Sequence, residues 1–270
     1  MSQAVAWMDG EWSSPDELSI PVSDRGLRLA DGVFETILTI GSKPQLLSLH
    51  LERWRTGAEL LAMQPPPQGS DLEPLLMDAI TRAQLGQSSG ALRLNWSRGS
   101  TGGRGLAHPT SGKERFWLTL DPCEPEFKPV TTIISSHERR NANSRLSRCK
   151  TFAYGQAVLA RREALAAGMD DALLLNTNGE LCCSTSANLL VCRDGAWLTP
   201  PLSSGCLPGV MRARALATGL CREAWIGASL KPTDQALLIN SLGCREIQSV
   251  NGKTLIRASQ SQTLWGNLLL

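Results

Sequence analysis

Residues 150–191 read KTFAYGQAVLARREALAAGMDDALLLNTNGELCCSTSANLLV, and the order of signals within this stretch decides the fold. Apolar residues recur at helical spacing after Lys150, which predicts a helix from there to just before Gly168. Two apolar runs then flank Asn178-Gly179, a dipeptide typical of a two-residue β-hairpin turn. The stretch therefore predicts a helix followed by a hairpin.

The rest of the second half carries the same kind of signal. Asp-Gly at 194–195 and Asn-Gly at 251–252 again separate apolar runs. A further helix is expected over about 209–218, where a glycine precedes a short periodic segment. This half is therefore expected to be rich in hairpins, with a few helices.

The first half instead alternates strands with helices. A buried strand is expected over 33–40, and a half-buried strand around 92–96. Helices are expected from about residue 48 to the prolines at 65–67 and over 71–85. This alternation is typical of a small α/β domain.

A boundary between the two halves is expected at residues 121–129. This segment, DPCEPEFKP, interrupts the pattern with three prolines and mixed charge. We therefore predict a mixed α/β (α+β) protein with a small α/β domain at 1–120, a linker at 121–129 and a larger, β-rich domain at 130–270.

Composition argues against several classes of protein. The 270 residues carry a net charge of only +2, and no aromatic residue interleaves the basic cluster at 137–150, so neither nucleic acid nor a membrane is an expected partner. The eight cysteines include no CxxC pair and lie far from the three histidines, so no metal site is expected. Without a signal peptide or a long apolar run, we expect a soluble protein of the reducing cytoplasm.

Lys150 is the first candidate for chemistry. It precedes the predicted helix, where the helix dipole disfavours a cation and so favours the neutral amine that Schiff-base formation needs. On this evidence alone, an ordinary surface lysine is the simpler interpretation. Tyr154, the only tyrosine of the chain, lies one helical turn further on, so its phenol is predicted to share a face with the amine. The alternative is a buried ring with a satisfied hydroxyl.

Two features could bind a phosphate group. Residues 207–212, LPGVMR, place Pro and Gly before a helix, which directs the amides of Val210 and Met211 at an anion. Arg53 lies off the apolar stripe of its predicted helix, and its planar guanidinium suits bidentate contact with phosphate. Taken singly, each feature is also compatible with a helix that merely faces solvent.

Residues 97–105, SRGSTGGRG, join four glycines with two arginines after a strand. No βαβ unit surrounds them, so they do not match a dinucleotide-binding fingerprint. A glycine-rich loop that carries Arg98 and Arg104 over a pocket would suit a small-molecule substrate with two carboxylates. An ordinary surface loop is the alternative.

Together these segments resemble the class IV aminotransferase family, the fold-type-IV enzymes that use pyridoxal 5′-phosphate (PLP). The resemblance rests on residues 150–191, on DGAWLTPPLSSGCLPGVMR at 194–212, and on SDRGLRLADGVFETI and LHLERW at 23–37 and 49–54. It therefore covers nearly the whole chain. It implies the two-domain fold of that family, PLP as cofactor and a homodimer.

The resemblance also implies roles for individual residues. Lys150 matches the Schiff-base lysine, Arg53 the phosphate-binding arginine, and Tyr154 a residue near the 3′ oxygen of the cofactor, with a one-residue difference in spacing from some members. The remaining matches are the backbone phosphate cradle at Val210 and Met211 and a second phosphate-side turn at Leu242 and Gly243.

One position departs from the family pattern. Cys183 stands where the family has a glutamate that contacts the pyridine nitrogen, and a thiol keeps that nitrogen protonated less well than a carboxylate does. Glu180 lies three residues earlier, so in a regular strand it would face the opposite side and could substitute only through a bulge or a register slip.

Within the family, the arginine-containing loop resembles that of the aminodeoxychorismate lyases more than that of the branched-chain or D-amino-acid aminotransferases. This resemblance implies a lyase that forms p-aminobenzoate and pyruvate for folate biosynthesis. The alternatives are an aminotransferase and a PLP-binding protein that has lost catalysis.

Overall fold

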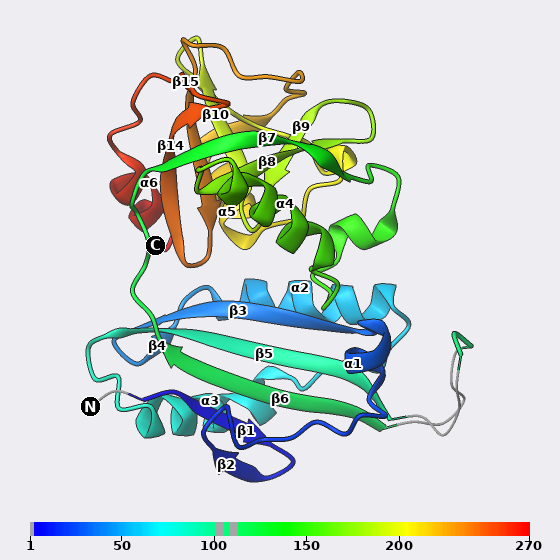
Figure 1. Ribbon diagram of the computed structural model, residues 1–270. Coiled ribbons are helices and arrows are strands. Elements are labelled where there is room, and N and C mark those ends of the chain that lie inside the picture. The colour runs from blue at the N-terminus through cyan, green and yellow to red at the C-terminus, as the bar shows by residue number, and fades with distance from the viewer. Residues whose placement is uncertain (1–2, 101–104, 108–112) are drawn as a thin grey trace. The chain divides into compact units, whose positions relative to one another are not determined.

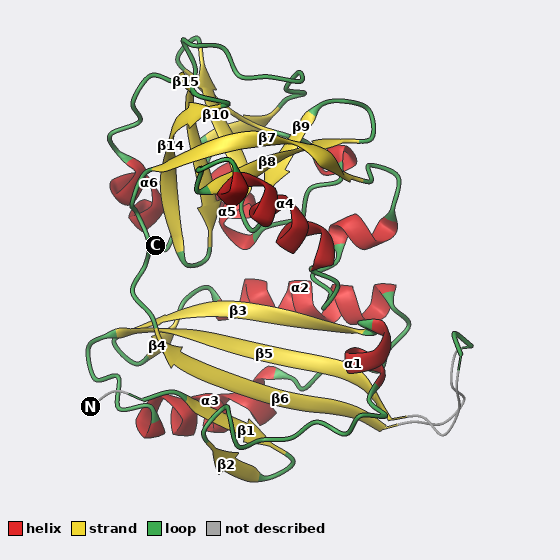
Figure 2. Cartoon of the chain, in the orientation of Figure 1, coloured by secondary structure: helices red, strands yellow, loops and turns green. Residues whose placement is uncertain are grey.

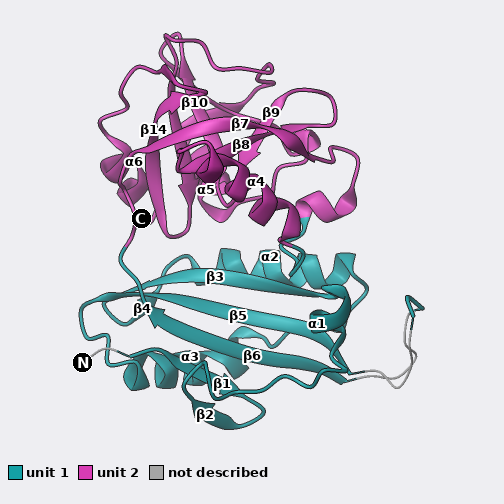
Figure 3. Cartoon of the chain, viewed as in Figure 1, with its two compact units in different colours: residues 1–124, 149–153 teal, residues 125–148, 154–270 magenta. Residues whose placement is uncertain are grey.

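The computed structural model describes residues 3–100, 105–107 and 113–270, and it has the mixed α/β architecture that the sequence predicts (Figure 2). The chain divides into two compact units (Figure 3): unit 1 is Met1–Glu124 with Cys149–Ala153, and unit 2 is Pro125–Arg148 with Tyr154–Leu270. The first passage between the units falls inside the predicted linker. The return of Cys149–Ala153 to unit 1 does not fit a division into two continuous segments.

Within the described residues, unit 1 contains a six-stranded antiparallel sheet in the order β2-β1-β6-β5-β3-β4 (Figure 1). Its strands are β1 (Val5–Met8), β2 (Glu11–Ser13), β3 (Gly32–Ile40), β4 (Lys43–Pro44), β5 (Ser89–Ser100) and β6 (Lys113–Pro122). Its helices are α1 (Arg25–Leu29), α2 (Leu47–Leu60) and α3 (Gly69–Arg82).

The alternation of β3 decides which side of this sheet is covered. Val33 and Ile37 pack with Trp54 of α2 and Leu72 of α3 in one buried cluster. Because successive side chains of a strand point to opposite faces, the even-numbered residues of β3, among them Phe34, face the other way. That second face carries Lys150 and Arg93, whereas Arg53 bonds Glu35 on the face covered by α2.

Unit 2 is built on a nine-stranded sheet, again counting described residues only. The main order is β12-β11-β10-β13-β14-β7-β8-β9; β15 pairs with β14, and β9 also pairs with β10. Its strands are β7 (Val130–Arg140), β8 (Asp171–Asn176), β9 (Leu181–Ser184), β10 (Asn188–Arg193), β11 (Ala196–Thr199), β12 (Cys221–Glu223), β13 (Gln235–Asn240), β14 (Gly243–Val250) and β15 (Lys253–Thr254). Its helices are α4 (Gly155–Ala166), α5 (Val210–Ala217) and α6 (Ser261–Asn267), with 3-10 turns at Arg145–Arg148 and Leu202–Ser204.

The predicted hairpins of unit 2 are confirmed. The turns at 178–179, 194–195 and 251–252 join β8 to β9, β10 to β11 and β14 to β15. Asp194 and Asn251 have positive φ angles of 52° and 49°, as the first position of a type I′ turn requires. None of the helices in the described ranges is long and apolar enough to cross a membrane.

The helix predicted after Lys150 begins later than expected. α4 starts at Gly155, with Tyr154 as its N-cap residue. The preceding backbone instead pairs with β3, because the Phe34 amide donates to the Lys150 carbonyl (2.9 Å) and the Phe152 amide donates to the Gly32 carbonyl (3.2 Å). The prediction that Lys150 and Tyr154 share one helical face was therefore wrong.

Candidate active site

Lys150 lies on the second face of the unit 1 sheet. Its segment forms a bridge between Thr151 and Val33, and its Nζ lies 4.3 Å from the centre of the Phe34 ring. Gly32 allows the segment that carries Lys150 to pack closely on β3, because a Cβ at position 32 would collide with the Phe152 ring. The lysine is thus held by sheet-type contacts that fix its backbone, and its half-buried amine lies against an aromatic ring.

Arg93 of β5 lies over the same ring, and it was not among the residues predicted from the sequence. Its Cζ lies 3.6 Å from the Phe34 ring centre, and its Nε donates to Asn95 Oδ1 at 2.8 Å. Since both distances end at one ring centre, Arg93 Cζ and Lys150 Nζ lie within about 8 Å of each other. The Arg93 guanidinium could therefore hold an anionic substrate group close to the Lys150 amine.

Arg53 is held by a buried carboxylate. Its Nε and Nη2 donate to the two oxygens of Glu35 at 2.7 and 2.6 Å, while His50 Nδ1 lies 2.7 Å from Glu35 Oε2. Burial raises the pKa of Glu35, but the Arg53 charge and the hydrogen bonds from His50 and Arg53 outweigh it and lower that pKa from 4.5 to about 2. Burial lowers the pKa of His50, against the effect of its bond to Glu35. The guanidinium predicted to bind phosphate is therefore oriented by a permanent anion.

Acid should lower the free energy of unfolding by protonating Glu35. Its folded pKa lies below the unfolded value, so its contribution to the free energy of unfolding is present above pH 4.5 and lost as the pH falls toward 2. We expect that loss to be about 3 kcal/mol. Chemical denaturation from pH 6 to pH 2.5 should show a shallower pH slope for Glu35→Gln than for the wild type, by close to one proton. Equal slopes would contradict this assignment.

Arg98 makes contacts of a different kind from those predicted. It is buried, its Nε donates to Asp31 Oδ2 at 2.8 Å, and its Nη1 and Nη2 donate to the carbonyls of Ala62 (3.1 Å) and Leu61 (2.5 Å). These bonds tie β5 to the end of α2. A role of Arg98 in substrate binding stays a prediction, and Arg104 lies outside the described residues.

In unit 2, Cys183 lies in a cluster of thiols and apolar side chains. Cys182, Cys183 and Cys206 are buried together with Leu174 and small residues of α4. The neighbouring thiols of Cys183 and Cys206, with burial, raise the pKa of Cys182. The side chains packed around Cys183 in this cluster are therefore uncharged or weakly acidic.

A β-bulge places Cys182 and Cys183 in the same cluster. The register of β8 and β9 shifts between the pairs Leu174–Cys183 and Leu175–Leu181, so Cys182 is the extra residue. The strict alternation used to place Glu180 on the opposite face therefore does not hold here. Glu180 nevertheless stays at the hairpin turn, where Asn176 Nδ2 donates to its Oε2 at 3.0 Å.

The start of α5 offers backbone donors for an anion. Its N-cap residue is Gly209, and no side chain caps the first turn, in which Val210 and Met211 are the first two helical residues. A Cβ at Gly209 would collide with Asn188 Oδ1, while Asn188 Nδ2 holds the Leu207 carbonyl at 2.9 Å. This donor set fits a phosphate group.

At the turn of Leu242 and Gly243, the backbone is constrained by contacts within the chain. The Leu242 amide donates to Asn240 Oδ1 at 2.8 Å. Gly243 has a φ of +151°, and a Cβ there would collide with the backbone of Glu126. Only glycine fits this close approach of two chain segments. A phosphate contact at this turn stays a prediction.

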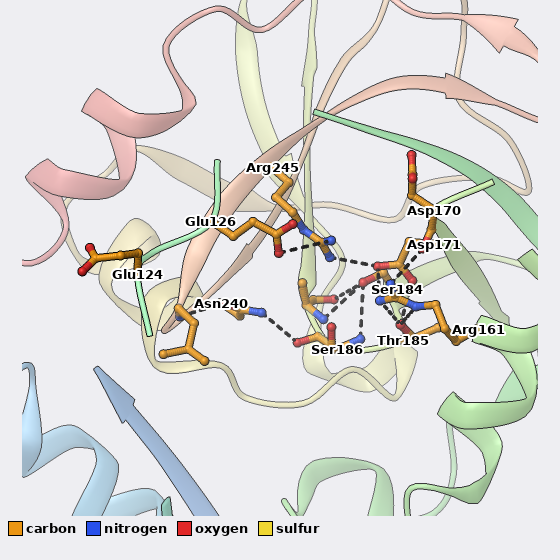
Figure 4. Close-up of polar contacts among 12 residues, drawn as sticks. Glu124, Glu126, Arg161, Asp170, Asp171, Ser184, Thr185, Ser186, Asn240 and Arg245 are labelled. Atoms are coloured by element: carbon orange, nitrogen blue, oxygen red, sulfur yellow. Dashed lines mark hydrogen bonds and ion pairs between the residues drawn. The ribbon is translucent and has the colours of Figure 1, made fainter. Parts of the chain in front are cut away.

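A buried ion network supports the loop that follows Cys183 (Figure 4). Asp171 lies between Arg161 Nη2 (2.8 Å) and Arg245 Nη2 (3.1 Å) and also accepts from Thr185 Oγ1 at 2.7 Å. In the same loop, the Ala187 amide donates to Ser184 Oγ at 3.2 Å. The conformation of the backbone after β9 is thus fixed by charges and by its own hydroxyls.

Comparisons with known proteins agree with this fold. The sequence profile of the Amino-transferase class IV family matches residues 32–250. A branched-chain-amino-acid aminotransferase of Pseudomonas aeruginosa is 26% identical over 217 residues, covering 77% of this chain and 70% of that protein. An aminodeoxychorismate lyase of Vibrio harveyi is 26% identical over 215 residues, covering 73% and 72%.

The structural likeness is broader than the sequence likeness. A hypothetical aminotransferase from Mycobacterium tuberculosis, solved in a PLP-bound form, superposes with a TM-score of 0.84 at 21% identity and covers 99% of this chain and 97% of that one. At that identity the likeness shows the fold alone. The profile match supplies the family: the chain belongs to the class IV aminotransferases, whose cofactor is pyridoxal phosphate.

Proposed function

We propose that this protein is a 4-amino-4-deoxychorismate lyase, which forms p-aminobenzoate and pyruvate. The observation that carries the proposal is the setting of Cys183, a buried thiol among thiols and apolar side chains, with Glu180 bonded to Asn176 at the turn. An aminotransferase depends on strong electron withdrawal through a protonated pyridine nitrogen. The lyase reaction gains driving force from aromatisation of its product, so it tolerates a thiol at this position better.

The chemistry that PLP supplies when bound is the withdrawal of electrons from the carbon that bears the substrate amine. Lys150 Nζ acts as general base and removes the proton at C4 of the substrate ring. As the C3–O bond breaks, Lys150 returns that proton to the departing enolpyruvate, so that p-aminobenzoate and pyruvate form. The sheet-type contacts fix the lysine backbone from which the amine extends.

The remaining residues bind and orient. Arg93 lies within reach of the Lys150 region and can bind one of the two substrate carboxylates. Arg53 and the first turn of α5 at Val210 and Met211 are the proposed phosphate ligands. Tyr154, by the family resemblance, contacts the 3′ oxygen of the cofactor.

Two relatives support different reactions. The Vibrio harveyi lyase supports cleavage of aminodeoxychorismate, and the Pseudomonas aeruginosa enzyme supports amino transfer to a branched-chain substrate, which is the second candidate. A homodimer and a cytoplasmic location, expected from the sequence, belong to the same proposal.

Product analysis separates the candidates. The PLP-loaded protein is incubated with aminodeoxychorismate and, separately, with an amino acid and 2-oxoglutarate. Pyruvate and p-aminobenzoate in the first reaction support the lyase, and glutamate in the second supports an aminotransferase. The absence of product in both reactions would indicate lost catalysis.

A matched pair of variants tests the role of Cys183. We expect Cys183→Glu to raise the rate of amino transfer by about tenfold or more relative to lyase turnover, since one tenfold step corresponds to about 1.4 kcal/mol of transition-state stabilisation. Cys183→Gln introduces a side chain of nearly the same shape as glutamate but without its charge, so it should not raise the rate of amino transfer. Unchanged rates in both reactions for Cys183→Glu would contradict this account of the position.

A further inference from the structure

Unit 1 contains a cavity of about 670 Å³ that is separate from the residues assigned to catalysis above. The rings of Trp7, Trp96 and Phe116 line it, and they come from three neighbouring strands, β1, β5 and β6. The centres of the Trp7 and Phe116 rings lie 5.5 Å apart, and Trp96 is the register partner of Phe116. All three side chains are only half-buried, so their rings remain accessible from the cavity.

The rim of the cavity is acidic. Asp71 and Asp78 line it from α3, seven residues and so about two helical turns apart, with Leu75 between them. No lysine or arginine belongs to its described lining. Asp78 pairs with Arg82 at 3.0 Å, but both side chains are nearly half-exposed, and such helical surface pairs are weak.

The walls are poor in hydrogen-bond donors. Three prolines, Pro65, Pro67 and Pro74, line the cavity and carry no amide hydrogen. The Trp96 indole N–H donates to the Gln64 carbonyl at 3.0 Å. The cavity therefore presents carboxylates and aromatic faces and few hydrogen-bond donors.

We propose that this cavity binds an organic cation, a tertiary or quaternary ammonium group carried on an apolar body. Aromatic faces attract such cations through the ring quadrupole, and the carboxylates add a Coulomb attraction. An anion would be repelled by the rim, and a neutral polar ligand would find few donors. The volume is typical of small-molecule sites. This site is independent of the proposed lyase reaction.

Titration of the full-length protein tests the charge preference. Benzyltrimethylammonium is the probe, and phenylmethanesulfonate is an anion of similar size. We expect the cation alone to shift the indole N–H signals of Trp7 and Trp96 in ¹⁵N-labelled protein, with the signals identified through Trp7→Phe and Trp96→Phe. Absence of these shifts, or equal shifts with the anion, would overturn the proposal.

Variants on α3 test the residues. Asp71→Asn with Asp78→Asn should weaken binding of the cation at least fivefold, whereas Glu73→Gln, which removes an exposed charge from the same helix, should change it less than twofold. Leu75→Trp should narrow the cavity beside the two carboxylates and weaken binding without a change of charge. Equal weakening by Glu73→Gln, or none by the double variant, overturns the proposal.

Two further measurements test whether the cavity joins copies of the chain and whether it is coupled to the active site. Sedimentation with and without the cation should give the same mass; a mass that changes would show that this face joins copies of the chain, and the proposal would be wrong. Lyase and aminotransferase rates should be the same in the α3 variants and the wild type, so the outcome here does not depend on the reaction that the active site performs.

Discussion

Lys150→Ala should lose at least about 10⁴-fold in turnover, the size of loss typical when a central catalytic group is removed. The variant retains the backbone that pairs with β3, since the Phe34 amide bonds to the main-chain carbonyl of residue 150. The loss is therefore expected without unfolding. Borohydride reduction of the wild type should fix the cofactor to the peptide that contains Lys150, and no reduced cofactor should remain on the variant.

A matched control is available in the same unit. Lys43→Ala removes an exposed lysine from β4 and should leave turnover and borohydride labelling unchanged. A wild-type protein with no reducible visible chromophore, or labelling of a lysine other than Lys150, would show that this residue does not hold the cofactor.

Arg93→Met should lower kcat/KM by about 10²- to 10³-fold, because it removes the charged partner of a substrate carboxylate while it keeps an unbranched chain against Phe34. Most of this effect should appear in KM, since the contact is present before and after the chemical step. Arg93→Lys keeps the charge without the planar fork and should recover part of the loss.

The control for Arg93 is an arginine outside the site. Arg55→Met on α2 removes a guanidinium that is 56% exposed and pairs only weakly with Glu59 at 3.9 Å. It should leave KM unchanged. If Arg93→Met and Arg55→Met give the same KM as the wild type, Arg93 does not bind the substrate.

Much of the fold follows from local signals in the sequence. The Asn-Gly and Asp-Gly turns place hairpins correctly because their backbone angles are specific to that geometry. The helix after Lys150 was extended too far toward the N-terminus because pattern alone cannot show that residues 150–152 pair with β3. That pairing joins segments more than a hundred residues apart, and no local propensity encodes it.

The candidate site was predicted unevenly for a similar reason. Lys150 and Arg53 follow from the family pattern. Arg93 was missed, although Arg93 and Asn95 alternate with Leu92 and Leu94, which is the signal of a strand with one polar face. The sequence could not indicate that this face also receives Phe34, since the register between β3 and β5 is a tertiary property.

The position of Glu180 illustrates the limit of counting faces along a strand. A regular strand would place Glu180 opposite Cys183, but the bulge at Cys182 breaks that alternation. Glu180 still stays at the turn, where Asn176 Nδ2 donates to its Oε2. A bulge shifts the pairing of a strand by one residue. No periodic pattern in a four-residue strand can reveal such a shift.

The return of Cys149–Ala153 to unit 1 constrains how the protein can be made by the ribosome. When residue 124 leaves the exit tunnel, the first sheet is still missing the segment that covers Phe34 and carries the amine. Unit 1 is completed only after part of unit 2 has been translated, so the two units cannot fold strictly one after the other. A gene segment that encodes residues 1–124 alone therefore lacks part of unit 1, because residues 149–153 are encoded within the stretch that encodes unit 2.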